Sequence, residues 1–259
     1  MRQAVRALGW TINILWIIII IFTGTAIYSA SNLRISLGQP ELSSSDALVM
    51  LSFPLSINNT SYYDISELNS TIDVIDYNGS VILTSATMVP LIPHGNNIET
   101  AHNVSANLND LAQRAPGYLF NDTIFDVNIS TKFRYAHAFA FQFLHNTTIH
   151  WGAPLYNFSL GQISYESYNL THQEAVIPVS FENHSPFLSM TGQIRLQIFN
   201  DMNDFIGSGA INVDVPPYSS YEGQIEALID LSELTESGAL HFYFETPMFS
   251  FGPQVISYG

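Results

Sequence analysis

Apolar positions follow two patterns along the chain. From Leu8 to Tyr28 the residues are uncharged and mostly apolar. At about 1.5 Å per residue, this run makes a helix of roughly 30 Å, the thickness of the hydrocarbon layer of a bilayer. After about Ser29, apolar and polar residues alternate with a period of two, as in half-buried β-strands. The pattern predicts one transmembrane helix followed by β-sheet.

The alternation is clearest in five segments, each of which predicts one strand: residues 139–143, 194–198, 211–215, 225–231 and 240–244. Short strands joined by turns, with no long amphipathic helix, indicate antiparallel sheets packed face to face.

Two turns and one helix are predicted between strands. Asn78-Gly79 predicts a two-residue hairpin turn because both residues tolerate positive φ, and residues 200–204 predict a longer turn. An apolar face predicts a short helix over about 107–118, ended by Pro116 and Gly117. The loop after it, with Asn121 and Asn128, is interpreted as an insertion.

An internal repeat with a period near 123 residues runs through the polar part of the chain. Its matched segments, in order, are 36–39 with 159–162, 55–59 with 179–183, 72–78 with 194–200, Val89 and Pro93 with Val213 and Pro217, and 108–111 with 231–234. Five matches in one order indicate two copies of one domain.

These elements predict the domain organisation. Residues 1–7 form a cytoplasmic N-terminus, 8–30 a transmembrane signal-anchor helix, 31–150 a first β-sandwich and 151–259 a second. The junction at 150–156 is short, so we expect the two sandwiches to hold a fixed relation. The fold class is all-β, with two tandem immunoglobulin- or fibronectin-III-like antiparallel sandwiches after one transmembrane helix.

The charges predict an orientation and exclude some partners. Arg2 and Arg6 precede the apolar run, so the positive-inside rule places the N-terminus in the cytoplasm and the rest outside the cell. Five basic residues then stand against 22 acidic ones outside, which argues against nucleic acid and anionic lipid headgroups. The chain has no cysteine, so neither disulfides nor thiolate metal sites can form.

Asn-x-Ser/Thr acceptors for N-linked glycans occur only in the part predicted to lie outside. They are Asn58, Asn59, Asn69, Asn78, Asn103, Asn121, Asn128, Asn146, Asn157, Asn169 and Asn183. Residues 187–259 carry none, so we expect a protein contact on that bare end.

The composition resembles that of exposed surface proteins of archaea from hot, acidic water. The chain has one lysine, no cysteine, few charges and many Tyr, Asn, Ser and Thr. Near pH 3 many carboxylates, with ordinary pKa values of about 4, would be neutral. An acidic secreted protein is the alternative.

The repeated pattern resembles the LEA14 family, also called LEA2 or the water-stress and hypersensitive-response (WHy) domain. The second copy carries it best, in residues 175–183, 185–186, 192–199, 206–209, 215–217 and 223–234. The family has Pro directly after the strand-ending Asn, whereas Asn183 and Asn59 here are followed by His184 and Thr60. The resemblance implies a fibronectin-III-like sandwich, no shared catalytic residues and, in some anchored tandem members, lipid handling.

No residue set predicts catalysis, a cofactor or a metal. His145 and His150 do not have a known ligand spacing. Residues 201–204 begin like a calcium loop but lack its later ligands, and Gly207-Ser208-Gly209 lacks the nucleophile-elbow frame and is typical of a bulge. Asp73 and Asp76 are one carboxylate pair among many. We expect no enzyme activity.

The C-terminal end is rich in aromatic residues, which alternation places mostly in the core. They are Phe242, Tyr243, Phe244, Phe249, Phe251 and Tyr258. If both faces of that last strand are apolar, one could dock on a partner or on the membrane surface.

The sequence therefore predicts a non-enzymatic, membrane-anchored, glycosylated tandem sandwich displayed outside the cell. Its partners are the bilayer, through residues 8–30, and membrane or surface-layer proteins or further copies of itself. Two alternatives stay open. Arg6-Ala7-Leu8 resembles a class III signal cleavage site, which would make the chain a pilin-like filament subunit. The family resemblance would make it a lipid-binding module. A cleaved signal peptide with an exit near 29–31 is a further possibility.

Overall fold

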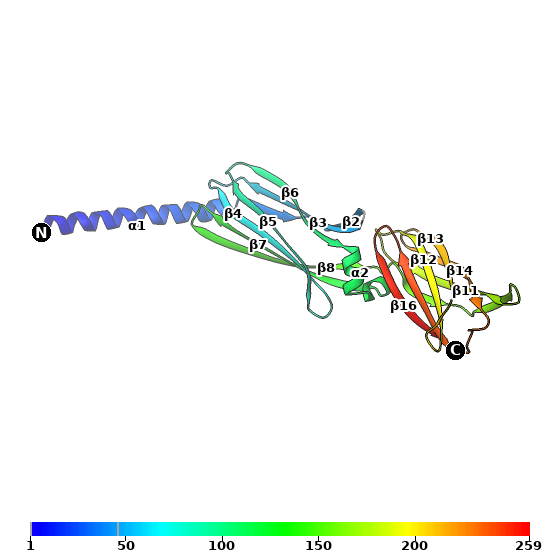
Figure 1. The fold of residues 1–259 in the computed structure, drawn as a ribbon. Coiled ribbons are helices and arrows are strands. Elements are labelled where there is room, and N and C mark those ends of the chain that lie inside the picture. Colours follow the sequence, from blue (N-terminus) through cyan, green and yellow to red (C-terminus); the bar gives the residue numbers. More distant parts are fainter. Residues whose placement is uncertain (1, 46) are drawn as a thin grey trace.

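The computed structural model describes residues 2–45 and 47–259, with side chains from Leu8 onward (Figure 1). It confirms the all-β fold class: antiparallel sheets follow one long helix, α1 (Arg2–Ala30). The molecule is elongated, with α1 at one end and the C-terminus in the far half (Figure 1). The side chains of Arg2 and Arg6, on which the predicted orientation depends, lie outside the described part.

Helix α1 has a free part and a docked part. Every side chain from Leu8 to Ile21 is exposed, and residues Leu8–Ala30 are long and apolar enough to cross a membrane. The last turns pack on the first sandwich, where Ala26 and Ser29 are buried and the Tyr135 hydroxyl lies 2.8 Å from Ser29 Oγ. Phe22 stacks on Phe139 with 5.8 Å between ring centroids. Helix and sandwich are therefore joined by side-chain packing as well as by the chain.

Two four-stranded sheets face each other in the first sandwich. In one, β1 and β2 share one side of β3 and β6 takes the other; the second has the order β5-β4-β7-β8. The strands are β1 (Leu33–Leu37), β2 (Glu41–Ser45), β3 (Leu48–Asn59), β4 (Ile65–Ile75), β5 (Val81–Ile92), β6 (Asn97–Asn107), β7 (Thr123–Tyr135) and β8 (Phe139–Trp151).

The next eight strands repeat every one of these pairings. β9 and β10 share one side of β11, β14 takes the other, and β13-β12-β15-β16 follow in order. The strands are β9 (Tyr156–Leu160), β10 (Ser164–Ser167), β11 (His172–Asn183), β12 (Met190–Asn200), β13 (Phe205–Val215), β14 (Ser219–Asp230), β15 (Gly238–Glu245) and β16 (Ser250–Tyr258). All five strands expected from the alternation are present.

One local contact shows how closely the two units match. Gly38 N donates to Pro54 O at 2.7 Å, and Gly161 N donates to Pro178 O at 2.9 Å. Both glycines lie directly against the proline ring, where an added Cβ would be crowded. The repeat in sequence is thus also a repeat in strand pairing, and the chain passes from one unit to the other within the expected junction at 150–156.

The hairpin after β4 corrects one predicted turn, and the hairpin after β12 confirms the longer turn predicted over residues 200–204. Both are five-residue turns in which the first side chain accepts from two backbone N–H groups: Asp76 from Asn78 and Ser80, and Asn200 from Met202 and Asp204. Positive φ occurs only once in each, at Gly79 and Asn203. The predicted two-residue Asn78-Gly79 turn is wrong.

This shared turn also corrects the alignment of the repeat. Asp76 is equivalent to Asn200, so the offset here is 124 residues and the match of 72–78 with 194–200 is wrong by two positions. Because side chains in a strand alternate, a shift of two keeps the same face inward, and the sequence pattern cannot detect it.

The predicted helix over 107–118 is two short helices, α2 (Leu108–Arg114) and α3 (Gly117–Phe120). Asn107 caps α2 by accepting from the backbone N–H groups of Asn109 and Asp110. Helix α2 ends before Pro116, as expected. Asn128 lies within β7 and not in a loop, so the loop prediction is wrong for that residue.

Candidate functional site

The α2–α3 segment connects the two sandwiches. The Phe120 ring, at the end of α3, meets three rings of the second sandwich: Phe158 at 6.4 Å, Phe244 at 5.8 Å and Phe251 at 5.8 Å between centroids. Phe158 comes from β9 and Phe251 from β16, the two edge strands that border the gap between the sheets. Phe120 therefore fills that gap from outside the second sandwich.

Hydrogen bonds at the junction hold this segment in place. Leu155 N donates to Leu119 O at 2.9 Å, and Trp151 Nε1 donates to Tyr118 O at 2.8 Å. Trp151 and Leu155 are buried, and one hydrophobic cluster runs through both sandwiches. The apolar core is thus continuous across the junction.

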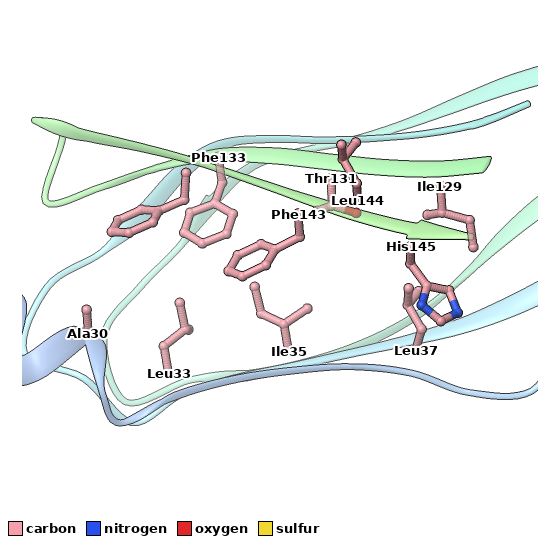
Figure 2. A pocket seen from close by; sticks show the side chains of 11 residues that line it. Ala30, Leu33, Ile35, Leu37, Ile129, Thr131, Phe133, Phe143, Leu144 and His145 are labelled. Carbon is pink, nitrogen blue, oxygen red and sulfur yellow. The ribbon is translucent and has the colours of Figure 1, made fainter. Parts of the chain in front are cut away.

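The corresponding side of the first sandwich is open. A groove of about 500 Å³ lies between β1 and β8, and Figure 2 shows Phe133 and Phe143 facing Leu33 and Ile35 across it. Its lining is Ala30, Leu33, Ile35, Leu37, Ile129, Thr131, Phe133, Phe141, Phe143, Leu144 and His145. Ala30 is the last residue of α1, so the groove begins where the helix ends. The lining is mostly apolar, as in ligand-binding pockets of this size.

Strand registers relate this groove to the gap that Phe120 fills. With Asp76 equivalent to Asn200, Ser70 corresponds to Ile194; Thr131 pairs with Ser70 and Phe143, and Phe244 pairs with Ile194 and Phe251. Thr131 is then equivalent to Phe244, and Phe143 to Phe251.

The third partner of Phe120 also has a counterpart in the groove. Ile35 is equivalent to Phe158, because Ser36-Leu37-Gly38 matches Ser159-Leu160-Gly161. The three rings around Phe120 thus correspond to Ile35, Thr131 and Phe143, all of which line the groove. In the described part of the chain, no ring from outside the first sandwich packs among these three residues as Phe120 does in the second.

Strand β8 forms one wall of the groove and has an unprotected edge. It pairs with β7 alone, over thirteen residues without a register shift. From Phe139 to Trp151 it contains no proline and no Asp, Glu, Lys or Arg. Phe143 is 51% exposed and Leu144 72% exposed. Long, uncharged, apolar edges of this kind are templates for pairing with another chain.

A second, more polar cleft of about 590 Å³ lies at the junction, with His184 in its wall. The ring of His184 stacks on Tyr156 at 4.1 Å, with Nδ1 2.7 Å from Asp122 Oδ2 and Nε2 2.9 Å from Glu182 Oε2. Hydrogen bonds with the Asp122 carboxylate, and then with that of Glu182, raise the pKa of His184. Asp122 follows α3 and Glu182 lies in β11, so the His184 ring bridges the two units.

His102 in β6 has the opposite environment. Its side chain is 1% exposed, and both ring nitrogens lack a hydrogen-bond partner among the described residues. Burial lowers the pKa of this imidazole, which favours its neutral form.

The predicted glycan acceptors differ in accessibility. Exposed are Asn78, Asn103, Asn121, Asn128, Asn146, Asn157 and Asn169, whereas Asn58 and Asn69 are half-buried. Asn128 and Asn146 are direct cross-strand neighbours on β7 and β8. Occupancy of the exposed acceptors stays a prediction.

Asn59 and Asn183 are fully buried and occupy equivalent places. Asn59 Nδ2 lies within hydrogen-bonding distance of three carbonyls, those of Tyr63, Ile92 and Pro93. Asn183 Nδ2 does the same with Leu188, Val215 and Pro216. Each amide satisfies carbonyls where the chain leaves the sheet, so the fold argues against the predicted acceptor role of these two residues.

The other residues considered for chemistry have structural surroundings. His145 lies in the groove and His150 in the junction cleft, on one strand. Asp201 lies in the five-residue turn, Thr84 donates to Asp73, and backbone N–H groups of the turn lower the pKa of Asp76. Over residues 2–45 and 47–259, no group of three or more His, Asp or Glu side chains could hold a metal ion.

The predicted bulge lies directly before this segment, at Ile206, because the register shifts between the pairs Ile198–Gly207 and Phe199–Phe205. Gly207 and Gly209 follow the bulge in regular pairing. They pair with Ile229 and Ala227 of β14, and an added Cβ would lie 2.3 Å from Leu228 O and 2.4 Å from Glu226 O. The two glycines allow β13 and β14 to approach, which closes the second sandwich on that side.

The C-terminal aromatic residues are mostly in the core. Phe242, Phe244 and Phe249 are buried, Phe251 packs on Phe120, and the Tyr258 hydroxyl donates to Phe199 O at 3.2 Å. Strand β8, which the alternation predicted to be half-buried, exposes Phe141, Phe143 and Leu144. Its composition, apolar and without charge, was the available signal.

No family model matches the chain, and no curated protein matches it, so the LEA14 resemblance stays a prediction. Among solved structures, the periplasmic chaperone SfaE is 10% identical with a TM-score of 0.32, covering 86% of this chain and 97% of the chaperone. A glycosyl hydrolase family 2 member from Bacteroides cellulosilyticus is 10% identical (TM-score 0.32), covering 81% of this chain and 28% of the hydrolase. The structure called pT26-6p is 8% identical with a TM-score of 0.30, covering 91% of this chain and 67% of that chain.

Proposed function

We propose that this chain is a non-enzymatic, membrane-anchored subunit that holds two sandwiches outside the cell for binding to a membrane or cell-surface assembly. The observation that carries the proposal is the join between α1 and the first sandwich. Ala26 and Ser29 are buried in it, Tyr135 donates a hydrogen bond to Ser29, and Phe22 stacks on Phe139. A segment removed after export would not need such contacts, so they favour a retained anchor over a cleaved signal peptide.

The rigid connection of the two sandwiches supports a binding or spacing role. Phe120 and the hydrogen bonds of Tyr118 and Leu119 join the units through one apolar core. A subunit with such a core holds its far sandwich at a fixed distance from the membrane. Independent, flexibly linked domains would not need the α2–α3 segment.

Placement outside the cell rests on the sequence. Arg2 and Arg6 before the apolar run favour a cytoplasmic N-terminus, and seven of the Asn-x-Ser/Thr acceptors are exposed in the fold. The excess of acidic residues suits an exposed, soluble surface. The residues considered for catalysis have structural partners, which supports a binding role.

The test is purification of the full chain from its native membrane in a mild detergent. We expect a stoichiometric partner, or a defined homo-oligomer, to remain bound. Recovery as a lone monomer under conditions that preserve known membrane complexes would contradict the proposal.

A further inference from the structure

The open groove and the free edge of β8 together form a surface that the proposed function does not yet use. We propose that they take an apolar segment of a partner polypeptide, which lies along β8 and inserts a large side chain between β1 and β8. The inference rests on the proposed function, since it names how the anchored subunit holds its partner.

The second sandwich shows what kind of group suits this position. Its equivalent gap is occupied by Phe120, a side chain supplied by a polypeptide segment that does not belong to that sandwich. In the first sandwich Ile35 replaces Phe158 and Thr131 replaces Phe244. Both residues are smaller than phenylalanine, which leaves a wider opening of about 500 Å³.

The edge of β8 supplies the second, independent reason for a polypeptide. Its outer backbone groups have no strand partner in the described part of the chain. An added strand would satisfy these N–H and C=O groups, as in recognition by β-strand addition, whereas an acyl chain would not. Asn146 alternates with His145, which lines the groove, so a glycan on Asn146 would project from the opposite face of β8.

Charge and position define the partner further. The part of the chain after α1 holds five basic and 22 acidic residues, whereas β8 holds neither. A neutral or basic segment with alternating apolar side chains is therefore complementary. Because the groove begins at Ala30, the segment belongs to a protein at the same membrane surface.

A second copy of this chain cannot pair antiparallel with β8 at this site. Antiparallel pairing of two β8 strands would point the α1 helices in opposite directions. Each second sandwich extends beyond the first (Figure 1), so it would run into the membrane that anchors the other copy.

The experiment compares four forms of the full chain, each purified from its native membrane in mild detergent. Ile35→Phe narrows the groove with the residue that the second sandwich uses, and Leu144→Lys places a charge on the edge strand. Val81→Lys, on the exposed part of β5 at the other edge of the same sheet, is the matched control. We expect at least a tenfold loss of bound partner with the first two variants and none with the third.

A second measurement keeps the proposal testable if a variant fails to fold. Amide hydrogen exchange of the wild-type complex is compared with that of the chain stripped of its partner. We expect slower exchange over residues 139–146 in the complex. Undiminished partner binding by folded Ile35→Phe and Leu144→Lys, or unchanged exchange in β8, would overturn the proposal while leaving the proposed function intact.

Two other outcomes are a lipid bound in the groove and a chain recovered without any partner. Native mass spectrometry that finds one acyl lipid bound to the wild type and lost in Ile35→Phe would assign the groove to the bilayer and overturn the polypeptide proposal. A chain recovered alone and without lipid would instead reject the proposed function itself.

Discussion

The second sandwich repeats every strand pairing of the first, but the two differ in how one gap between the sheets is closed. In the second, Phe120 packs among Phe158, Phe244 and Phe251. In the first, the equivalent positions line an open groove beside β8, whose outer edge has no strand partner in the described part of the chain. The duplicated fold thus carries a gap that needs covering, and this chain covers one of its two copies. The comparison teaches that the open copy is the place to look for a partner.

The largest effect is expected from Phe120→Ala. Removal of a ring that joins both sandwiches leaves a cavity, and we expect a loss of about 2–4 kcal/mol of unfolding free energy, since Phe120 is half-buried. Chemical denaturation of the purified chain measures it. Met88→Ala, at an exposed site, is the control, with an expected change within about 0.5 kcal/mol. Equal losses of unfolding free energy in the two variants would show that Phe120 does not close the second sandwich.

The buried asparagines test what the two copies have in common. Asn59→Ala and Asn183→Ala each leave three carbonyls without their amide donor, so we expect each to cost about 2–3 kcal/mol. Denaturation curves and intact mass would be recorded together. A glycan found on either asparagine in the folded wild type would contradict the structural role given to it.

Swapping the residue types at the equivalent positions Phe158 and Ile35 tests the difference between the closed gap and the open groove. Phe158→Ile removes ring contacts with Phe120, Phe242 and Phe244 and is expected to cost about 1–2 kcal/mol. The reverse change, Ile35→Phe, enters open space, so stability should stay within about 1 kcal/mol of wild type. Thermal unfolding of both variants checks this, and equal destabilisation would show that the first groove is closed.

Two histidines should give small pH effects of opposite sign. The pKa of His184 is raised by Asp122 and Glu182, so its stabilisation is present below the ordinary value of about 6.5 and is lost as pH rises through the folded pKa. The pKa of His102 is lowered by burial, so its contribution is complete above about 6.5 and is lost as pH falls.

Matched variants separate these two contributions. His184→Gln should flatten the stability profile above about pH 6.5, and His102→Leu should flatten it below about pH 6.5. Denaturation midpoints taken at steps across neutral pH provide the readout. A profile unchanged by either variant would show that the histidine concerned does not contribute.

Much of the fold was predictable because alternation alone fixes which side chains face inward. The strands over 194–198 and 240–244 were found in this way, whereas α1 was predicted from the uninterrupted apolar run at 8–28. The alignment of the two repeats could not be predicted there, because a shift of two residues keeps the same side chains facing inward. Only the turns at Asp76 and Asn200 reveal the true offset between the repeats.

The groove could not be predicted for a related reason. Phe120 lies in a short helix whose position depends on the packing of both sandwiches, and no local pattern marks it as the residue that closes a gap. Ile35 and Thr131 read as ordinary strand residues. The uncharged composition of β8 was visible, but its place at a sheet edge follows only from the topology.

The central claim is that α1 anchors a rigid pair of sandwiches outside the cell. Because the chain has no cysteine, a single Met202→Cys, at an exposed site in the second sandwich, gives one thiol to label. The account predicts that a membrane-impermeant maleimide modifies this thiol in intact cells as fully as in lysed ones. Modification only after lysis would contradict it.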